Sequence, residues 1–104
     1  VAPETTTRTN ALIAGQLVEV MVAPVPDEAG ALGPASVERV VAEAGRAAAL
    51  AIGPGIGRAP ATTAAVAAVL ERLDLPAVVD ADGLWHLGDA PERVAGRGAP
   101  TVLT

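Results

Sequence analysis

Cysteine is absent from the sequence, which excludes disulfide bonds and thiolate metal sites. Phe and Tyr are absent as well, and a single Trp is the only large aromatic residue. Apolar residues, mostly Ala, Val and Leu, nevertheless make up 51% of the 104 residues, which argues against a disordered chain. We therefore expect one small folded domain or a piece of a larger one, with a core of small side chains that bury little area each.

Lysine is absent too, so all seven basic residues are Arg, and the formal net charge is −5. A protein that binds a nucleic-acid backbone needs a basic face, so we expect no nucleic-acid partner. No apolar run approaches the roughly 20 residues of a membrane-spanning helix, and no stretch resembles a signal peptide. We expect a soluble cytoplasmic protein without a membrane partner, and the lack of cysteine fits a reducing compartment.

Strand-like and helix-like patterns alternate along the chain. The predicted strands are 18–23, 47–52, 77–79 and 100–104. Helices are predicted over 4–14, from Pro34 to Gly45, and from Pro60 to the Leu75-Pro76 pair, with a short helical turn over 82–85. The polar, Gly-rich residues 89–98 carry no predicted element. Spacing of this kind predicts an α/β fold with a mostly parallel sheet, in which the continuously apolar strand 47–52 is buried on both faces.

The stretch Gly-Pro-Gly-Ile-Gly at residues 53–57 follows a predicted strand directly and precedes a predicted helix. It lacks the Lys-Ser/Thr pair of a P-loop, and its third glycine is misplaced for G-x-G-x-x-G. It is either a turn that needs positive φ angles or a loop whose two or three backbone N–H groups line a cleft for a polar ligand. Arg58 would add a charge there or remain solvated.

Asp80 and Asp82 follow the predicted strand 77–79, so they belong at the same edge of the sheet as the glycine loop. Asp82 is either the N-cap of the helical turn or a ligand-binding residue. Asp80 is expected at the tip of a buried strand, where a carboxylate is costly unless it binds something. Its possible partners are a ligand hydroxyl, a hydrated Mg²⁺, or the backbone donors of the glycine loop.

His86 is the only histidine, and with no second histidine or cysteine near it we expect a partly exposed helix residue and no metal site. Trp85 is expected to pack against the protein rather than stack on a ligand. Ser36 opens a helix, so it is no candidate nucleophile, and no nucleophile, base and acid can be combined into a catalytic set. We expect no catalytic residue in this chain.

Four stretches together resemble the NAD(P)H-hydrate dehydratase family of the ribokinase-like superfamily. They are VMVAP at 20–24, IGPGIGR at 52–58, PAVVDADGLW at 76–85 and TVLT at 101–104. The resemblance covers nearly the whole chain, in the right order and at the right spacing. It implies a three-layer αβα fold with a mostly parallel sheet.

The resemblance implies an enzyme that removes water from the S epimer of hydrated NADH or NADPH at the expense of ADP or ATP, with Mg²⁺. The terminal phosphate of the nucleotide would activate the ring hydroxyl, which then leaves. Residues that match the family's substrate side are Gly53, Gly55, Gly57, Asp80 and Asp82. The expected partners are the hydrate and the nucleotide, and we expect a homo-oligomer.

The chain departs from the family pattern in what it lacks. In the family, a Pro followed by His or Asn comes after the V-L-T motif, and a Lys-Gly nucleotide segment and a Gly-x-Gly-Asp motif with the catalytic base come later. None of these is present, and neither is the N-terminal strand with its glycine-rich turn. We therefore expect residues 1–104 to be the central part of one ribokinase-like domain, inactive and not independently folded.

Two alternative functions are compatible with the same residues. The first is a ribokinase-like kinase for a small molecule of the hydroxyethylthiazole or hydroxymethylpyrimidine type. The second is a non-catalytic α/β module that serves as an interaction or structural element. A kinase leaves a phosphorylated small molecule behind, whereas a dehydratase does not.

Overall fold

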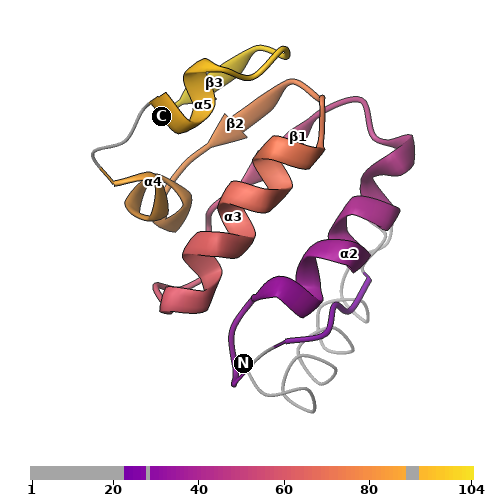
Figure 1. The fold of residues 1–104 in the computed structure, drawn as a ribbon, viewed down its shortest axis with the longest axis vertical. Coiled ribbons are helices and arrows are strands. Elements are labelled where there is room, and N and C mark those ends of the chain that lie inside the picture. Colours follow the sequence, from indigo (N-terminus) through magenta and orange to yellow (C-terminus); the bar gives the residue numbers. More distant parts are fainter. Residues whose placement is uncertain (1–22, 28, 89–91) are drawn as a thin grey trace.

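Strands and helices alternate in the computed structural model, which describes residues 23–27, 29–88 and 92–104 (Figure 1). Three strands form one parallel sheet in the order β1-β2-β3. β1 spans Leu50–Ile52, β2 spans Ala77–Val79 and β3 spans Thr101–Leu103. The predicted α/β fold with a parallel sheet is confirmed. The predicted helix 4–14 and residues 18–22 of the first predicted strand lie outside the described residues.

Proline begins both long helices, as the sequence predicts. α2 spans Pro34–Glu43 and continues into a 3-10 turn, η1, at Ala44–Arg46, whereas α3 spans Pro60–Arg72. Proline suits the first helical position because an N–H there would have no partner within the helix. The predicted helical turn after β2 is α4, at Asp82–Leu87. A further short helix, α5 at Glu92–Ala95, lies in the stretch for which the sequence predicts no element.

The core surrounds α3, which packs against one face of the sheet and, along its flank, against α2 on the same face (Figure 1). The buried cluster on the sheet side consists of Val66, Leu70, Ala77, Val79 and Leu87. The buried cluster on the α2 side consists of Val37, Ala65, Val69 and Leu73. The apolar residues at helical spacing in and just after α3 are all buried; they are Val66, Val69, Leu70 and Leu73. Burial of each such Val or Leu contributes about 1.5–3 kcal/mol to folding.

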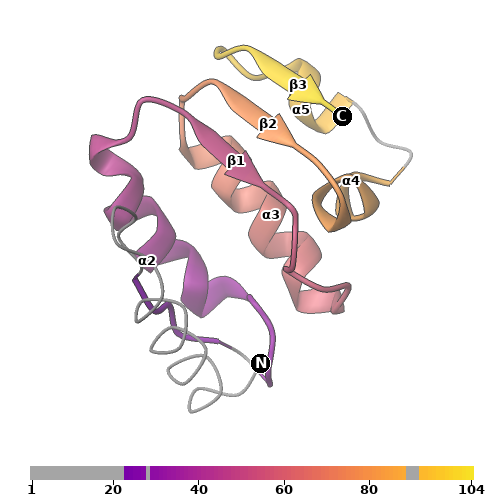
Figure 2. The same ribbon diagram turned by 180° about the vertical axis from the view of Figure 1, so that it is seen from behind.

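The prediction for residues 47–52 is wrong in two respects. Only Leu50–Ile52 form a strand, and Ala51 is exposed rather than buried between two helix layers. The register places Ala51 beside Val78, and Val78 beside Val102. Val78 is 40% exposed and Val102 is 54% exposed. α2 and α3 lie on the other face, and no described helix covers this one (Figure 2). The second helix layer of the αβα arrangement therefore stays a prediction.

An ion pair between Arg72 and Glu38 joins α3 to α2 at the surface. Hydrogen bonds from the Arg72 guanidinium, together with its charge, lower the pKa of the Glu38 carboxyl. A carboxyl whose pKa is lower in the folded state favours folding while it is ionised. The contribution is present above the ordinary pKa of Glu and is lost as the pH falls through the lowered value. Both side chains are largely exposed, so the contribution is small.

Arg97 joins the end of α3 to the last strand. Its guanidinium donates hydrogen bonds to the carbonyl oxygens of Leu70, Leu73 and Leu75 at 2.7–2.8 Å, and to the Thr101 hydroxyl at 2.6 Å. The last carbonyls of a helix have no partner within the helix, so they need donors from elsewhere. Arg97 supplies those donors and at the same time holds the start of β3 in place.

Replacement of Arg97 by Leu should lower the free energy of unfolding by about 2–3 kcal/mol, because several partly buried carbonyl groups lose their donor. Arg93→Leu is the matched control, since Arg93 is an exposed arginine on the adjacent turn of α5. Chemical denaturation of the full-length protein measures both. Equal losses in the two variants would contradict the structural role of Arg97.

Candidate functional site

The carboxyl ends of β1 and β2 bring the glycine loop and the aspartate segment together, as the sequence predicts. The Asp80 N–H donates to the Ile52 carbonyl at 3.1 Å, and the Gly83 N–H donates to the Asp80 carbonyl at 2.9 Å. A Cβ atom on Gly53 would lie 1.7 Å from the Asp80 carbonyl oxygen, and one on Gly83 would lie 2.9 Å from the Ile52 carbonyl oxygen. Both glycines are therefore required for the backbones to approach this closely.

The glycine loop has the positive φ angles that the turn interpretation of its sequence requires. The φ angles of Gly53, Gly55 and Gly57 are 140°, 80° and 76°. In contrast to Gly53, a Cβ on Gly55 or Gly57 would meet no atom within 4 Å. Space is therefore open beside the outer half of the loop, where a ligand could approach the backbone.

Two of the loop's backbone donors are used inside the protein. The Ile56 N–H donates to the Gly53 carbonyl at 3.3 Å, and the Gly57 N–H donates to Asp82 Oδ2 at 3.2 Å. In the described part of the chain, the N–H of Gly55 has no such partner. The N–H groups of Ile56 and Gly57 are therefore not available to a ligand. The N–H of Gly55, at the middle of the loop, remains as a free donor.

Asp82 does not cap α4, so that interpretation of the sequence is wrong. Ala81 occupies the N-cap position, and Asp82 is the first residue of the helix. The Asp82 carboxylate accepts the hydrogen bond from Gly57 and a second one, 3.1 Å long, from Arg58 Nε. Asp82 therefore anchors the glycine loop, the role that the sequence offers for Asp80.

Asp80 is exposed, so the prediction of a costly carboxylate at the tip of a buried strand is wrong. Asp80 follows the last residue of β2, and its side chain is exposed to solvent at the end of the sheet. Asp80 Oδ1 accepts a hydrogen bond of 2.8 Å from the N–H of Ala81. The other carboxylate oxygen has no partner among the described residues, which leaves an acceptor beside the open side of the loop.

The exposure of His86 and Trp85 is the opposite of what we expect from the sequence. His86 is buried, with 4% of its surface exposed, whereas Trp85 is 48% exposed. The Arg58 guanidinium carbon lies 5.3 Å from the centre of the Trp85 ring, over its face. Asp82 and His86 are four residues apart, so they lie on one face of α4. This spacing is the sequence signal that would have placed His86 beside the site.

Ala81 has the backbone angles φ 50° and ψ −127°, which alanine rarely adopts. It lies between the two aspartates, and its carbonyl accepts hydrogen bonds from the N–H groups of Leu84 and Trp85. Strained residues of this kind concentrate at functional sites, where the surrounding structure holds them. The strain at Ala81 therefore favours a functional role for this edge of the sheet.

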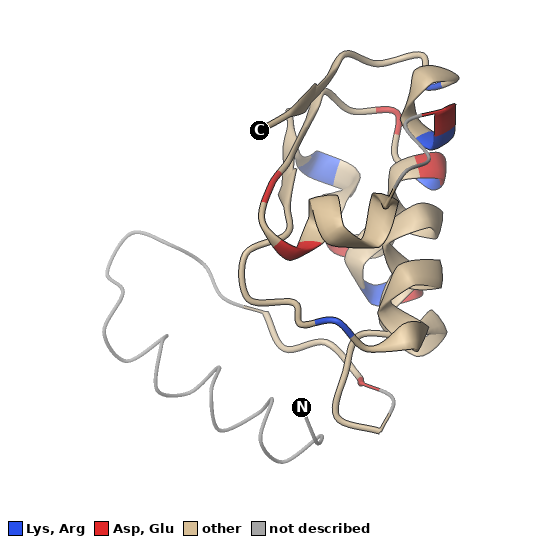
Figure 3. Cartoon of the chain, turned by 90° about the vertical axis from the view of Figure 1, so that its left-hand side faces the viewer, with Lys and Arg blue, Asp and Glu red and all other residues tan. Residues whose placement is uncertain are grey.

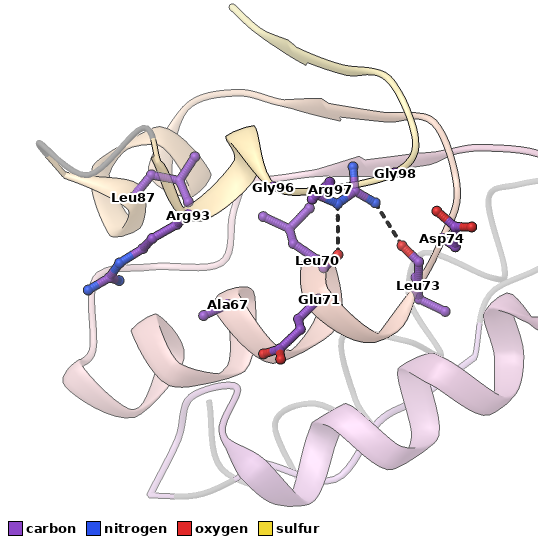
Figure 4. Close-up of a pocket in the computed structure, with 10 residues that line it drawn as sticks. All are labelled: Ala67, Leu70, Glu71, Leu73, Asp74, Leu87, Arg93, Gly96, Arg97 and Gly98. Carbon is purple, nitrogen blue, oxygen red and sulfur yellow. Dashed lines mark hydrogen bonds between the residues drawn. The ribbon is translucent and has the colours of Figure 1, made fainter.

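A depression of about 490 Å³ lies away from this edge, between α3 and α5 (Figure 4). Glu71 and Arg93 line it with opposite charges, and the donors of Arg97 are directed at the carbonyl groups of α3. We assign no function to the depression, because the Arg97 guanidinium that lines it already donates its hydrogen bonds to carbonyl groups of the protein.

Charges of both signs are interspersed along the chain (Figure 3). Three arginines form ion pairs with nearby carboxylates: Arg39 with Glu43, Arg58 with Asp82, and Arg72 with Glu38. Within the described ranges, no three histidine or acidic side chains come together as metal ligands. Among the same residues, no helix has the length and apolar character needed to cross a membrane.

Comparison with known proteins adds an independent line of evidence. A family model described as NAD(P)H-hydrate dehydratase matches residues 3–104. A bifunctional NAD(P)H-hydrate repair enzyme of Mycobacterium tuberculosis is 56% identical over 63 residues, which are 61% of this chain and 13% of that protein. The enzyme of the same name from Salinibacter ruber is 39% identical over 98 residues, 91% of this chain and 18% of that protein.

A third relative, the ATP-dependent (S)-NAD(P)H-hydrate dehydratase of Schizosaccharomyces pombe, is 46% identical over 55 residues. That match covers 50% of this chain and 17% of the relative. The chain thus spans less than a fifth of the length of each of these three curated relatives.

Substitution of the loop glycines should separate close packing from simple φ strain. Gly53→Ala is expected to lower the free energy of unfolding by about 3 kcal/mol or more, because the new Cβ overlaps the Asp80 carbonyl. Gly55→Ala should cost about 1 kcal/mol, since only its positive φ disfavours alanine. Thermal denaturation of the full-length protein measures both, and equal losses would contradict the difference in packing.

Ala81→Gly should leave the melting temperature unchanged or raise it. Glycine relieves about 1–3 kcal/mol of strain at Ala81 and costs about 0.5–1 kcal/mol in the entropy of the unfolded chain. Ala64→Gly is the control, because Ala64 is an exposed residue inside α3 with ordinary helical angles. Equal destabilisation of both variants would show that Ala81 is not strained.

Proposed function

Because the chain belongs to the NAD(P)H-hydrate dehydratase family, we propose that the whole protein repairs hydrated nicotinamide cofactors. The reaction is the dehydration of (S)-NAD(P)H-hydrate to NAD(P)H at the expense of ADP or ATP. The match over residues 3–104 is the observation that carries this proposal. The names of the relatives, which include an ATP-dependent dehydratase, agree with it.

Within this activity, we assign the described residues to the substrate side. Gly53, Gly55 and Gly57 form the backbone surface against which the hydrated ring lies, and Asp80 and Asp82 flank it. The free N–H of Gly55 can donate to an oxygen of the substrate, and the free oxygen of Asp80 can accept from a ring hydroxyl. Asp82 acts through the loop, since its carboxylate is held by Gly57 and Arg58.

The chemistry requires help from outside this surface. A ring hydroxyl is a poor leaving group at neutral pH, and we assign no general acid to the described residues. The nucleotide's terminal phosphate activates the hydroxyl as a leaving group when the nucleotide is bound. The described residues contribute the binding and orientation of the substrate.

Mg²⁺ would accompany the nucleotide in this proposal. Hard cations of this type prefer carboxylate and phosphate oxygens. Among the described residues only Asp80 offers a free carboxylate oxygen at this edge, and no three potential ligands cluster there. This part of the chain therefore does not fit a Mg²⁺ site of its own, and the ion would depend on the phosphates and on other ligands.

We also propose that residues 1–104 form the central part of one ribokinase-like domain, with the nucleotide site and the catalytic base outside it. The small share of each relative that the chain covers supports this division. A cytoplasmic homo-oligomer is proposed for the whole protein, and the absence of cysteine from these 104 residues agrees with a reducing compartment. Sedimentation velocity of the full-length protein tests the oligomeric state.

The full-length protein should restore the absorbance of reduced nicotinamide from its S hydrate only when ADP or ATP is added. The 104-residue chain alone should give no restoration with either nucleotide, because we propose that the nucleotide site and the catalytic base lie outside it. A spectrophotometric assay with and without nucleotide measures both. Restoration without nucleotide would contradict the proposal, and a stable phosphorylated product would indicate a ribokinase-like kinase instead.

A further inference from the structure

Both main-chain polar groups of Gly57 are held by side chains of α4. Its N–H donates to Asp82 Oδ2 at 3.2 Å, and its carbonyl oxygen lies 2.8 Å from His86 Nε2. Asp82 and His86 lie one helical turn apart on the same face of α4. The six-residue helix α4 therefore anchors the glycine loop through two hydrogen bonds, which involve the N–H and the carbonyl group of Gly57.

The partners of His86 determine where its proton lies. A carbonyl oxygen can only accept, so Nε2 must carry the hydrogen that binds the Gly57 carbonyl. In the neutral imidazole Nδ1 is then an acceptor, and the Thr63 hydroxyl, 2.7 Å away, donates to it. Thr63 belongs to α3, so the ring is oriented by a helix that is itself fixed in the core.

Burial makes this arrangement costly to break. His86 is 4% exposed, and its ring meets the Trp85 ring edge-on with the centres 5.0 Å apart. A buried ring nitrogen that loses its partner pays the full penalty of desolvation. The ring is therefore held in one orientation and one tautomer, which a solvent-exposed histidine would not be.

We infer that His86 is a positioning residue for the substrate loop. Thr63 orients the ring, His86 fixes the Gly57 carbonyl, and the fixed loop presents the free N–H of Gly55 to the substrate. A loop held in its binding conformation pays less ordering cost when the ligand arrives. Loss of the hydrogen bond between His86 and Gly57 should therefore weaken substrate binding more than it slows the chemical step. The kinetic part of this inference rests on the proposed dehydratase function.

Two neighbouring threonines of α3 provide a matched test in the full-length protein. Thr63→Val removes the hydroxyl that orients His86, whereas Thr62→Val removes a buried hydroxyl that donates to the Leu32 carbonyl at 2.8 Å. Thr63→Val should raise the KM for the hydrate about five- to tenfold, the equivalent of one hydrogen bond, with kcat and the nucleotide KM changed less than about twofold. Thr62→Val should lower the melting temperature and leave all three constants within about twofold.

Variants of the histidine itself complete the kinetic test. His86→Leu should raise the KM for the hydrate at least as much as Thr63→Val does. His86→Gln should recover most of the affinity, because its amide N–H can reach the Gly57 carbonyl. The inference is overturned if Thr63→Val and Thr62→Val give the same KM, or if His86→Gln binds substrate no better than His86→Leu.

Nitrogen-15 NMR of the full-length protein tests the hydrogen bond between His86 and Gly57 without any assay of activity. The long-range spectrum of the His86 ring should show a proton on Nε2 and none on Nδ1. The Gly57 amide resonance should shift in Thr63→Val and stay in place in Thr62→Val. A proton on Nδ1 alone, or an unmoved Gly57 resonance, overturns the inference. If both NMR results hold while the hydrate is not a substrate, it is the proposed function that fails.

Discussion

The close approach of two backbones at the carboxyl ends of β1 and β2 is the constraint on which this structure depends. A Cβ on Gly53 would fall 1.7 Å from the Asp80 carbonyl oxygen, so only glycine allows the two segments to meet. The aspartate segment leads through Ala81 into α4, whose Asp82 and His86 form hydrogen bonds with Gly57 of the glycine loop. The substrate surface that we propose follows from this single contact.

The elements with strong local signals could be predicted from the sequence. Pro34 and Pro60 begin α2 and α3, and the stripe of Val66 and Leu70 faces the core, because proline chemistry and helical periodicity act within a few residues. The predicted burial of residues 47–52 is wrong because an apolar run reports hydrophobicity and not which neighbours cover it. Ala51 lies on the face that no described helix covers.

The site shows the same division between local and long-range information. The meeting of the two segments could be predicted, because the carboxyl ends of neighbouring parallel strands lie at one edge of the sheet. The positive φ angles are one of two interpretations of the glycine loop, and glycine permits them without strain. The partners of Asp82 and His86 could not be predicted, since they join residues 25 and 29 positions apart in the chain. A lone histidine without metal partners favours an exposed position on average, and the Thr63 and Gly57 contacts that bury it depend on how α4 packs against α3.

A crystal structure of the full-length protein with bound (S)-NAD(P)H-hydrate would test the central claim most directly. The account predicts that the hydrated ring lies against residues 53–57, with the N–H of Gly55 or the carboxylate of Asp80 within hydrogen-bonding distance, and with Gly57 still bound to Asp82 and His86. A substrate bound without contact to Gly55 and Asp80 would contradict the account.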